Sequence, residues 1–321
     1  MAHFDVFNGD ADGICALHQL RLAAPRPATL VTGTKHDIAL VARTHAQPGD
    51  TLTVLDLSFD TNRDALEPLL AAGLEIEYFD HHYAGDVPPY TNLRAYIDTT
   101  ADVCTSVLVD RHLGGRFRRW AVAAAWGDNL AETALALARS VGLSAAETAR
   151  LRDLGESMNY NAYGDSVQDL VIDPLALYDA LRPYADPLDF AAAAPVVAQL
   201  SDARRADIAR ARDLAPLAAL RWGSVHVLPD EPWARRVRGL FANDLANEEP
   251  ACAHAVLSTR ADGGYTVSVR APRNRPIGAD RLCRHFPGGN GRVGAAGIDC
   301  LPPERLNAFV DAFAMEFARA A

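Results

Sequence analysis

The chain has 321 residues, of which 49% are hydrophobic and 22% are charged, a composition that excludes an intrinsically disordered protein. Acidic residues occur from position 5 onward, and no apolar run approaches the roughly 18 to 20 residues of a membrane helix, so we expect a cytoplasmic protein. The net charge of −10 disfavours a protein that coats long nucleic acids, and five scattered cysteines without a CxxC pair exclude a zinc ribbon.

Strand and helix signals alternate over the first quarter of the chain. Runs rich in β-formers at 3–7, 28–33, 51–58 and 74–80 indicate strands, and a helical pattern over 61–73 ends at a glycine. This alternation predicts an α/β fold with a doubly wound parallel sheet. From about 100 to 215 the chain is rich in Ala and Leu at helical spacing, which predicts helices that cover the sheet.

Strand signals return at 224–229, 251–259 and 264–271, and a final helix is predicted over 302–321. These elements predict a second, smaller mixed α/β domain. We therefore expect a first domain over 1–185 and a second over 221–321, joined by a linker at 186–220, in a region that prolines interrupt.

Two carboxylates, Asp10 and Asp12, follow the first predicted strand in the stretch FNGDADGICAL. One Asp would suffice to cap the helix that begins there. The carboxyl ends of parallel strands are also where open α/β sheets bind ligands. A calcium loop would begin in the same way at Asn8, but its twelfth position is Gln19 where a bidentate Glu is needed.

Similar side chains end three later apolar runs. Asp56 ends TLTVLD, the triplet Asp80, His81 and His82 ends LEIEYFDHH, and Asp128 closes WAVAAAWGD. Asp56 or Asp128 alone could be a turn residue, and adjacent histidines can be ordinary surface residues. Together, these side chains are expected to converge on one solvent-facing rim, and a mixed Asp and His set suits Mn²⁺ or a similar ion.

The segments NGDADG, LDLS, FDHH and WGDN, in that order between about residues 4 and 130, resemble the four motifs of the DHH phosphoesterase superfamily. This superfamily includes RecJ-type exonucleases, nanoRNases, cyclic-dinucleotide phosphodiesterases, exopolyphosphatases and family II pyrophosphatases. The C-terminal stretch SVRAPRNRPIGADRLCRHFPGGNGRVGAAG resembles the substrate domain associated with DHH proteins. The resemblance covers most of the chain.

The resemblance implies two Mn²⁺ ions, with Mg²⁺ or Co²⁺ as alternatives, and a two-metal hydrolysis of phosphate esters. Asp10 and Asp56 would hold one ion, His82 would face the scissile phosphate, and Asp80 would orient an imidazole. The ligands of the other ion would be Asp12, Asp56, His81 and Asp128.

The sequence departs from the family pattern in two places. Many members carry a His at the position of Val6 or an Asp at the position of Asn8, and loss of that ligand weakens one metal site. Arg292 stands where the substrate domain usually has a His, within a run of seven arginines between 260 and 292. The residues expected to bind substrate phosphate, through arginines and the amides of a glycine loop, are Arg270, Arg275, Gly289, Gly291 and Arg292.

The resulting hypothesis is a Mn²⁺-dependent hydrolase, of the phosphodiesterase or nuclease type, with its active site in a cleft between two lobes. Its acidic balance favours short single-stranded oligonucleotides or small nucleotide phosphates over long polymers. A polyphosphatase or pyrophosphatase and a nucleotide-binding sensor without turnover are the alternatives. We expect no membrane partner, and a homodimer is compatible with the sequence.

Overall fold

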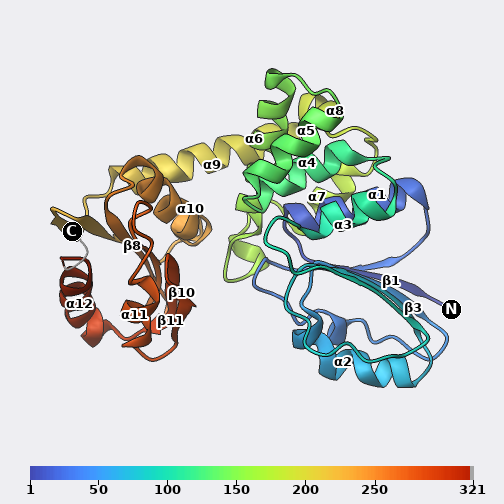
Figure 1. The fold of residues 1–321 in the computed structure, drawn as a ribbon, viewed down its shortest axis with the longest axis horizontal. Helices are drawn as coiled ribbons and strands as arrows, with labels where there is room; N and C mark the ends of the chain where they lie inside the picture. Colours follow the sequence, from blue (N-terminus) through green and yellow to red (C-terminus); the bar gives the residue numbers. More distant parts are fainter. Residues whose placement is uncertain (319–321) are drawn as a thin grey trace. The chain divides into compact units, whose positions relative to one another are not determined.

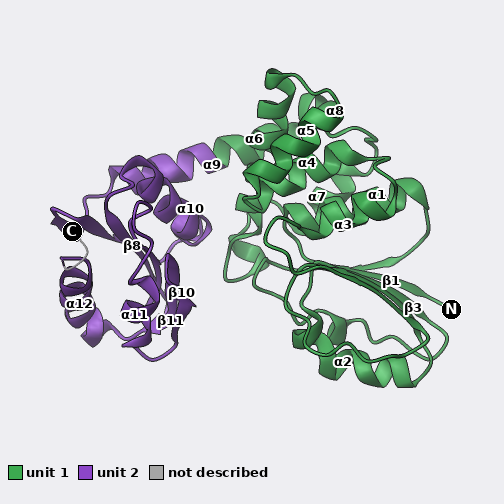
Figure 2. Cartoon of the chain, in the orientation of Figure 1, with its two compact units in different colours: residues 1–203 green, residues 204–321 purple. Residues whose placement is uncertain are grey.

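The computed structural model describes residues 1–318 (Figure 1). The chain divides into two compact units, Met1–Ala203 and Arg204–Ala321 (Figure 2). The boundary falls inside a helix, α9 (Pro195–Asp213), and the segment predicted as a linker also contains α8 (Pro187–Ala193). Residues 319–321 of the predicted final helix lie outside the described residues.

The first unit contains the predicted parallel sheet. Its five strands lie in the order β2-β1-β3-β4-β5, and every neighbouring pair is parallel. The edge strand β5, with sequence LRAYI, was not predicted, because it has no continuous apolar run. The strands are β1 (His3–Phe7), β2 (Thr29–Val31), β3 (Thr51–Leu55), β4 (Glu75–Asp80) and β5 (Leu93–Ile97).

Helices cover both faces of this sheet, as the doubly wound prediction requires. Figure 1 shows α1 and α3 on one face and α2 on the other. Short 3₁₀ turns η1 (Val41–Arg43) and η2 (Val167–Asp169) interrupt the connections. The α-helices of this unit that precede α8 are α1 (Ala11–Ala23), α2 (Phe59–Ala71), α3 (Thr105–His112), α4 (Arg118–Gly127), α5 (Ala131–Ser140), α6 (Ala145–Ala162) and α7 (Pro174–Leu181).

The second unit is built on a six-stranded mixed sheet in the order β10-β11-β9-β8-β7-β6. Only the β7 and β8 pair is parallel. The unit thus has the mixed α/β character that the sequence predicts. Its elements are β6 (Ala218–Leu220), β7 (Gly223–Leu228), α10 (Pro232–Glu248), β8 (Ala253–Thr259), β9 (Tyr265–Arg270), α11 (Ala279–Arg284), β10 (Gly289–Arg292), β11 (Ala295–Leu301), η3 (Pro303–Arg305) and α12 (Leu306–Ala318).

The glycine-rich run is a β-hairpin and not the expected loop, because β10 pairs with β11. A Cβ at Gly289 would lie 1.8 Å from the Cys283 carbonyl oxygen, so only glycine fits there. The Gly289 N–H donates to the Phe286 carbonyl (3.0 Å), and the Gly291 N–H donates to the Asn290 side chain (2.7 Å). The amides expected to cradle a phosphate therefore already donate to acceptors of the second unit.

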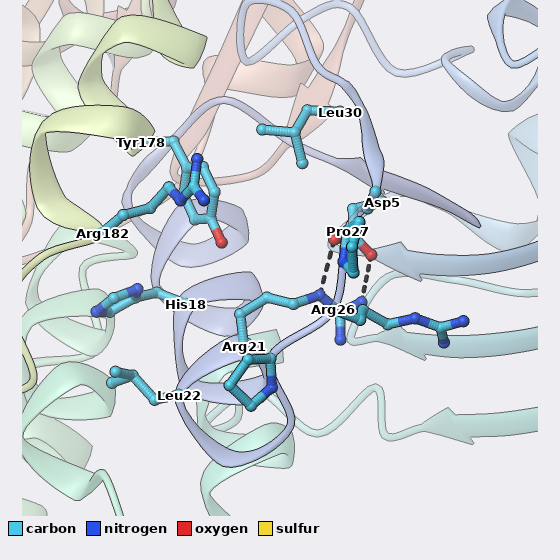
Figure 3. Close-up of a pocket in the computed structure, with 11 residues that line it drawn as sticks. Asp5, His18, Arg21, Leu22, Arg26, Pro27, Leu30, Tyr178 and Arg182 are labelled. Atoms are coloured by element: carbon cyan, nitrogen blue, oxygen red, sulfur yellow. Dashed lines mark hydrogen bonds and ion pairs between the residues drawn. The ribbon is translucent and has the colours of Figure 1, made fainter. Parts of the chain in front are cut away.

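A pocket of about 450 Å³ lies at the C-terminal end of α1 (Figure 3). Arg21, Arg26 and Arg182 line it, and the Arg21 Nε donates to Asp5 Oδ2 (2.8 Å). None of the residues predicted for the site lines this pocket. It lies at the opposite end of α1 from Asp10, the residue that caps the helix.

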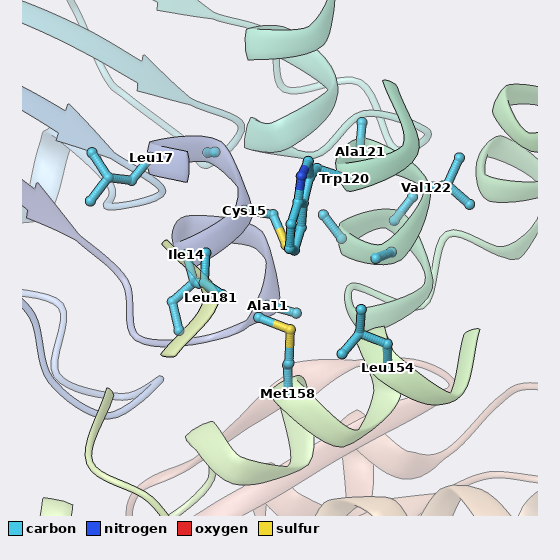
Figure 4. Close-up of a cluster of buried hydrophobic side chains, with 14 of the residues drawn as sticks. Ala11, Ile14, Cys15, Leu17, Trp120, Ala121, Val122, Leu154, Met158 and Leu181 are labelled. Atoms are coloured by element: carbon cyan, nitrogen blue, oxygen red, sulfur yellow. The ribbon is translucent and has the colours of Figure 1, made fainter. Parts of the chain in front are cut away.

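The largest core cluster of the first unit packs α1 against α4 and α6 around the fully buried Trp120 (Figure 4). A Cβ at Gly155 of α6 would lie 1.9 Å from the Ala123 carbonyl oxygen of α4, so glycine permits the close approach of these helices. This packing fixes the C-terminal end of α4, where Asp128 follows. Within residues 1–318, no helix combines the length and the apolar character needed to cross a bilayer.

Candidate metal centre

The carboxyl ends of four adjacent strands place polar side chains along one edge of the parallel sheet. Asp10 follows β1, Asp56 follows β3, and Asp80 is the last residue of β4. Lys35 lies in the loop after β2. Because parallel strands end at the same edge, residues far apart in sequence meet there, at the usual ligand-binding edge of α/β sheets.

The first two aspartates have different local roles. Asp10 is the N-cap of α1, and its Oδ1 accepts the N–H groups of Asp12 (2.9 Å) and Gly13 (3.1 Å). Asp12 accepts the N–H groups of Thr105 (2.7 Å) and Ser106 (2.7 Å), which begin α3. Capping thus falls to Asp10, while the N-terminus of α3 holds the Asp12 carboxylate in place.

His81 is oriented as a metal-binding imidazole. Its Nδ1 lies 2.9 Å from the Val103 carbonyl oxygen, which fixes this nitrogen as the donor and leaves Nε2 with its lone pair. Nε2 lies 3.4 Å from Asp56 Oδ1, 3.7 Å from Asp128 Oδ2 and 4.0 Å from Asp12 Oδ2. Asp12, His81 and Asp128 form one group of candidate ligand atoms, and Asp56, His81 and His82 form another. Such mixed carboxylate and imidazole sets suit a divalent cation such as Mn²⁺.

The carboxylates of this group repel one another. Asp56 is 2% exposed, so it lies in the interior and not on a solvent-facing rim, and it adopts a left-handed backbone conformation (φ +59°). Burial and the charges of Asp12 and Asp10 raise the pKa of Asp56 well above its usual range. Burial raises the pKa of Asp128 to about 6, although Lys35 opposes the rise. A bound cation would remove this repulsion, so the residues present fit a metal ion.

Asp80 and His82 form a pair beside this group. The His82 Nδ1 lies 2.7 Å from Asp80 Oδ1, and Asp80 is fully buried. Burial lowers the pKa of His82, but the hydrogen bond and charge of Asp80 outweigh it and leave the pKa raised. Because the His82 side chain is 45% exposed, its imidazole is presented to solvent next to His81, at 4.3 Å between ring centroids.

Lys35 is the residue of this site that sequence reasoning missed. Its ammonium group forms an ion pair with Asp10, lies 3.1 Å from Asn159 Oδ1 and lies 3.5 Å from Asp128 Oδ1. One signal could have identified it, because Lys35 is the only lysine of the chain and follows a predicted strand.

The arginines expected to bind substrate are in the second unit and most are engaged there. Arg270 donates from Nε to Asn243 Oδ1 (2.6 Å). Arg275 and Arg292 are exposed, and within residues 1–318 the Arg292 side chain has no hydrogen bond or ion pair. Other arginines of the run form ion pairs, namely Arg260 with Asp262, Arg281 with Glu316 and Arg284 with Asp280.

No protein-family model and no curated protein matches the sequence. Solved structures do match. Exonuclease RecJ bound to manganese is 18% identical, with 99% of this chain and 90% of that chain covered and a TM-score of 0.64. RecJ with Mn²⁺ from Thermus thermophilus is 19% identical, with coverage of 99% and 52% and a TM-score of 0.65, so this chain spans about half of that protein.

A third similar structure is the pGpG-specific phosphodiesterase PggH from Vibrio cholerae. It is 14% identical, with both chains covered completely and a TM-score of 0.59. RecJ and PggH are both DHH superfamily members. This chain therefore has a two-domain α/β fold of the RecJ-like DHH type, the fold that its four motifs predict.

Proposed function

We propose that the chain is a divalent-metal-dependent phosphoesterase. The observation that carries this proposal is the convergence of the His81 Nε2 with three carboxylates at the carboxyl edge of the sheet. The fixed Nδ1 of His81 gives the group a preset orientation, as in other metal-binding histidines. The ligands of the cation are Asp12, Asp56, His81 and Asp128.

The chain's own residues suit the hydrolysis of a phosphate ester. A bound cation would act as a Lewis acid on the phosphoryl group and would lower the pKa of a water molecule. His82, whose pKa the hydrogen bond and charge of Asp80 raise, is placed to donate a proton to the leaving oxygen or a hydrogen bond to the phosphoryl group. Asp80 positions His82 and does not itself contact the substrate.

The substrate class that we propose is a short oligonucleotide or a small nucleotide phosphate, and the cation is Mn²⁺. The fold is that of an exonuclease and of a phosphodiesterase specific for pGpG, and the RecJ crystals contain manganese or magnesium. In the second unit, the exposed Arg292 is the residue that we propose to bind a substrate phosphate.

A screen of hydrolysis tests the proposal. Purified protein is incubated with Mn²⁺, Mg²⁺, Co²⁺ or Ca²⁺ and with bis-p-nitrophenyl phosphate, di- to pentanucleotide RNAs, pGpG, pyrophosphate or polyphosphate. We expect hydrolysis of the nucleotide substrates with Mn²⁺ or Co²⁺ and little with Ca²⁺, since an imidazole ligand favours transition metals. His81→Ala should lose activity, while His112→Ala, which alters a histidine of α3 outside the centre, should keep it.

Two results would contradict the proposal. Equal rates with Ca²⁺ alone would count against an imidazole-containing metal centre. Hydrolysis confined to pyrophosphate or polyphosphate would establish the polyphosphatase alternative, and nucleotide binding without any turnover would establish the sensor.

A further inference from the structure

Lys35 is held firmly at the metal centre by its backbone as well as its side chain. Its N–H donates to the Ala162 carbonyl (2.9 Å), and its own carbonyl accepts from the Asn8 side chain (3.3 Å). Its ammonium group lies against Asp10, Asp128 and Asn159 and is 5.8 Å from the centre of the Tyr163 ring. Contacts from several separate segments of the chain therefore fix the position of this one positive charge.

Asp10, which was expected to hold a second cation together with Asp56, already accepts hydrogen bonds at both of its carboxylate oxygens. Asp10 Oδ1 accepts the two N–H groups of the α1 cap, and Asp10 Oδ2 accepts from Lys35. The Asn8 Oδ1 accepts the Asp10 N–H (3.2 Å), while its Nδ2 donates to Lys35. A second cation on Asp10 would also stand directly against the Lys35 ammonium, and these two positive charges would repel each other.

We propose that Lys35 takes the place of the second cation, so that this centre holds a single divalent ion. The inference rests on the proposed function, since it concerns the same site. A lysine ammonium is a compact point charge that binds phosphate, unlike the planar guanidinium of arginine. All 30 other basic residues of the chain are arginine (31 Lys and Arg minus one Lys), and the single lysine lies against Asp10 and Asp128.

Counting bound ions tests the inference without any measurement of turnover. Metal-free protein is titrated with Mn²⁺ by calorimetry, the bound metal is measured by mass spectrometry, and electron paramagnetic resonance reports whether two ions are spin-coupled. We expect one ion per chain and the spectrum of an isolated Mn²⁺. Two ions per chain with a spin-coupled spectrum would overturn the inference whatever the variants do.

A double variant makes the test reciprocal. Lys35→Met with Asn8→Asp removes the ammonium and restores the carboxylate, and we expect it to bind a second ion with a spin-coupled spectrum. The matched control is Arg43→Met, which removes a positive charge from an exposed ion pair with Asp37 and should still bind one ion. A folded double variant that binds only one ion would contradict the role of Lys35.

The single lysine gives an independent readout. Protein labelled with ¹³C-lysine has one Cε signal, which one equivalent of Mn²⁺ should broaden strongly, and an unchanged signal would contradict the placement of Lys35. The outcomes separate the two proposals. One bound ion without hydrolysis of any substrate would refute the phosphoesterase and leave Lys35 in place, whereas no bound ion would refute both.

Discussion

Replacing Asp128 by asparagine should stabilise the metal-free protein while it weakens metal binding. Asp128 Oδ2 lies 3.7 Å from His81 Nε2, and the side chain is 19% exposed. Burial, together with the nearby Asp12 and Asp10 carboxylates, raises its pKa from the ordinary 3.8 to about 6. At neutral pH the folded protein thus carries an ionised carboxylate in an unfavourable place, and Asn removes that charge with little change of shape.

The expected gain in the free energy of unfolding follows from the pKa of Asp128. The rise of about 2 corresponds to about 3 kcal/mol at about 1.4 kcal/mol per pKa unit. Because the pKa is raised in the folded state, this cost is absent below pH 3.8, grows as the pH rises to about 6, and is complete above it. For a unit of this size, about 3 kcal/mol corresponds to a melting temperature higher by roughly 6–12 °C.

Thermal denaturation with and without metal measures both effects. In EDTA at pH 7.5, Asp128→Asn should melt above wild type, and the difference should disappear near pH 4. Saturating Mn²⁺ at about 100 times its Kd would stabilise wild type by about 2.7 kcal/mol and the variant by less. A variant that melts below wild type in EDTA, or an equal Mn²⁺ shift in both proteins, would refute the reasoning.

Three further predictions concern other groups. Burial lowers the pKa of His18 to about 4, and its Nε2 donates to the Tyr184 carbonyl (2.7 Å), so the fold should lose stability as the pH falls from about 6.5 to 4. His18→Gln should reduce this loss when the free energy of unfolding is measured with denaturant at several pH values. An unchanged pH dependence of that free energy would contradict the prediction. Asp80→Asn should move the alkaline limb of the profile of kcat/KM against pH to lower pH, because it removes the charged hydrogen-bond partner that raises the pKa of His82. An alkaline limb that stays in place would exclude His82 as the acid. Arg292→Ala should raise KM for an oligonucleotide roughly 10- to 150-fold with a smaller change in kcat, in keeping with about 1.5–3 kcal/mol for a charge-assisted hydrogen bond. An equal rise of KM for bis-p-nitrophenyl phosphate would contradict a contact away from the scissile phosphate.

Much of the fold was predictable because local signals and tertiary structure agree. Four of the five strands of the parallel sheet are apolar runs bounded by turns, and their alternation with helices requires parallel pairing. The edge strand β5 lacked that signal, since its sequence LRAYI contains no continuous apolar run. The hairpin of β10 and β11 was mistaken for a loop because the reason for Gly289, its approach to the Cys283 carbonyl, is a tertiary contact.

The candidate site was predictable to the extent that strand ends mark it. Asp12, Asp56 and His81 end separate apolar runs, and a parallel sheet brings such ends together. The burial of Asp56 was missed because it depends on tertiary contacts, such as the hydrogen bond that the Thr105 hydroxyl of α3 donates to Asp56 Oδ1 (3.1 Å). Lys35 was missed because a single lysine in a loop ordinarily points to solvent, and its partner Asn159 lies 124 residues further along the chain.

The short segment that begins α3 links two ligands that follow different strands, Asp12 after β1 and His81 after β4. Val103 accepts from His81, and the amides of Thr105 and Ser106 hold Asp12. In evolutionary terms, an insertion or deletion here would displace both ligands in one step, although the segment carries no ligand of its own. Among descendants of this sequence, the length of this segment should therefore be inherited unchanged wherever Asp12 and His81 are retained, and should drift once either is lost.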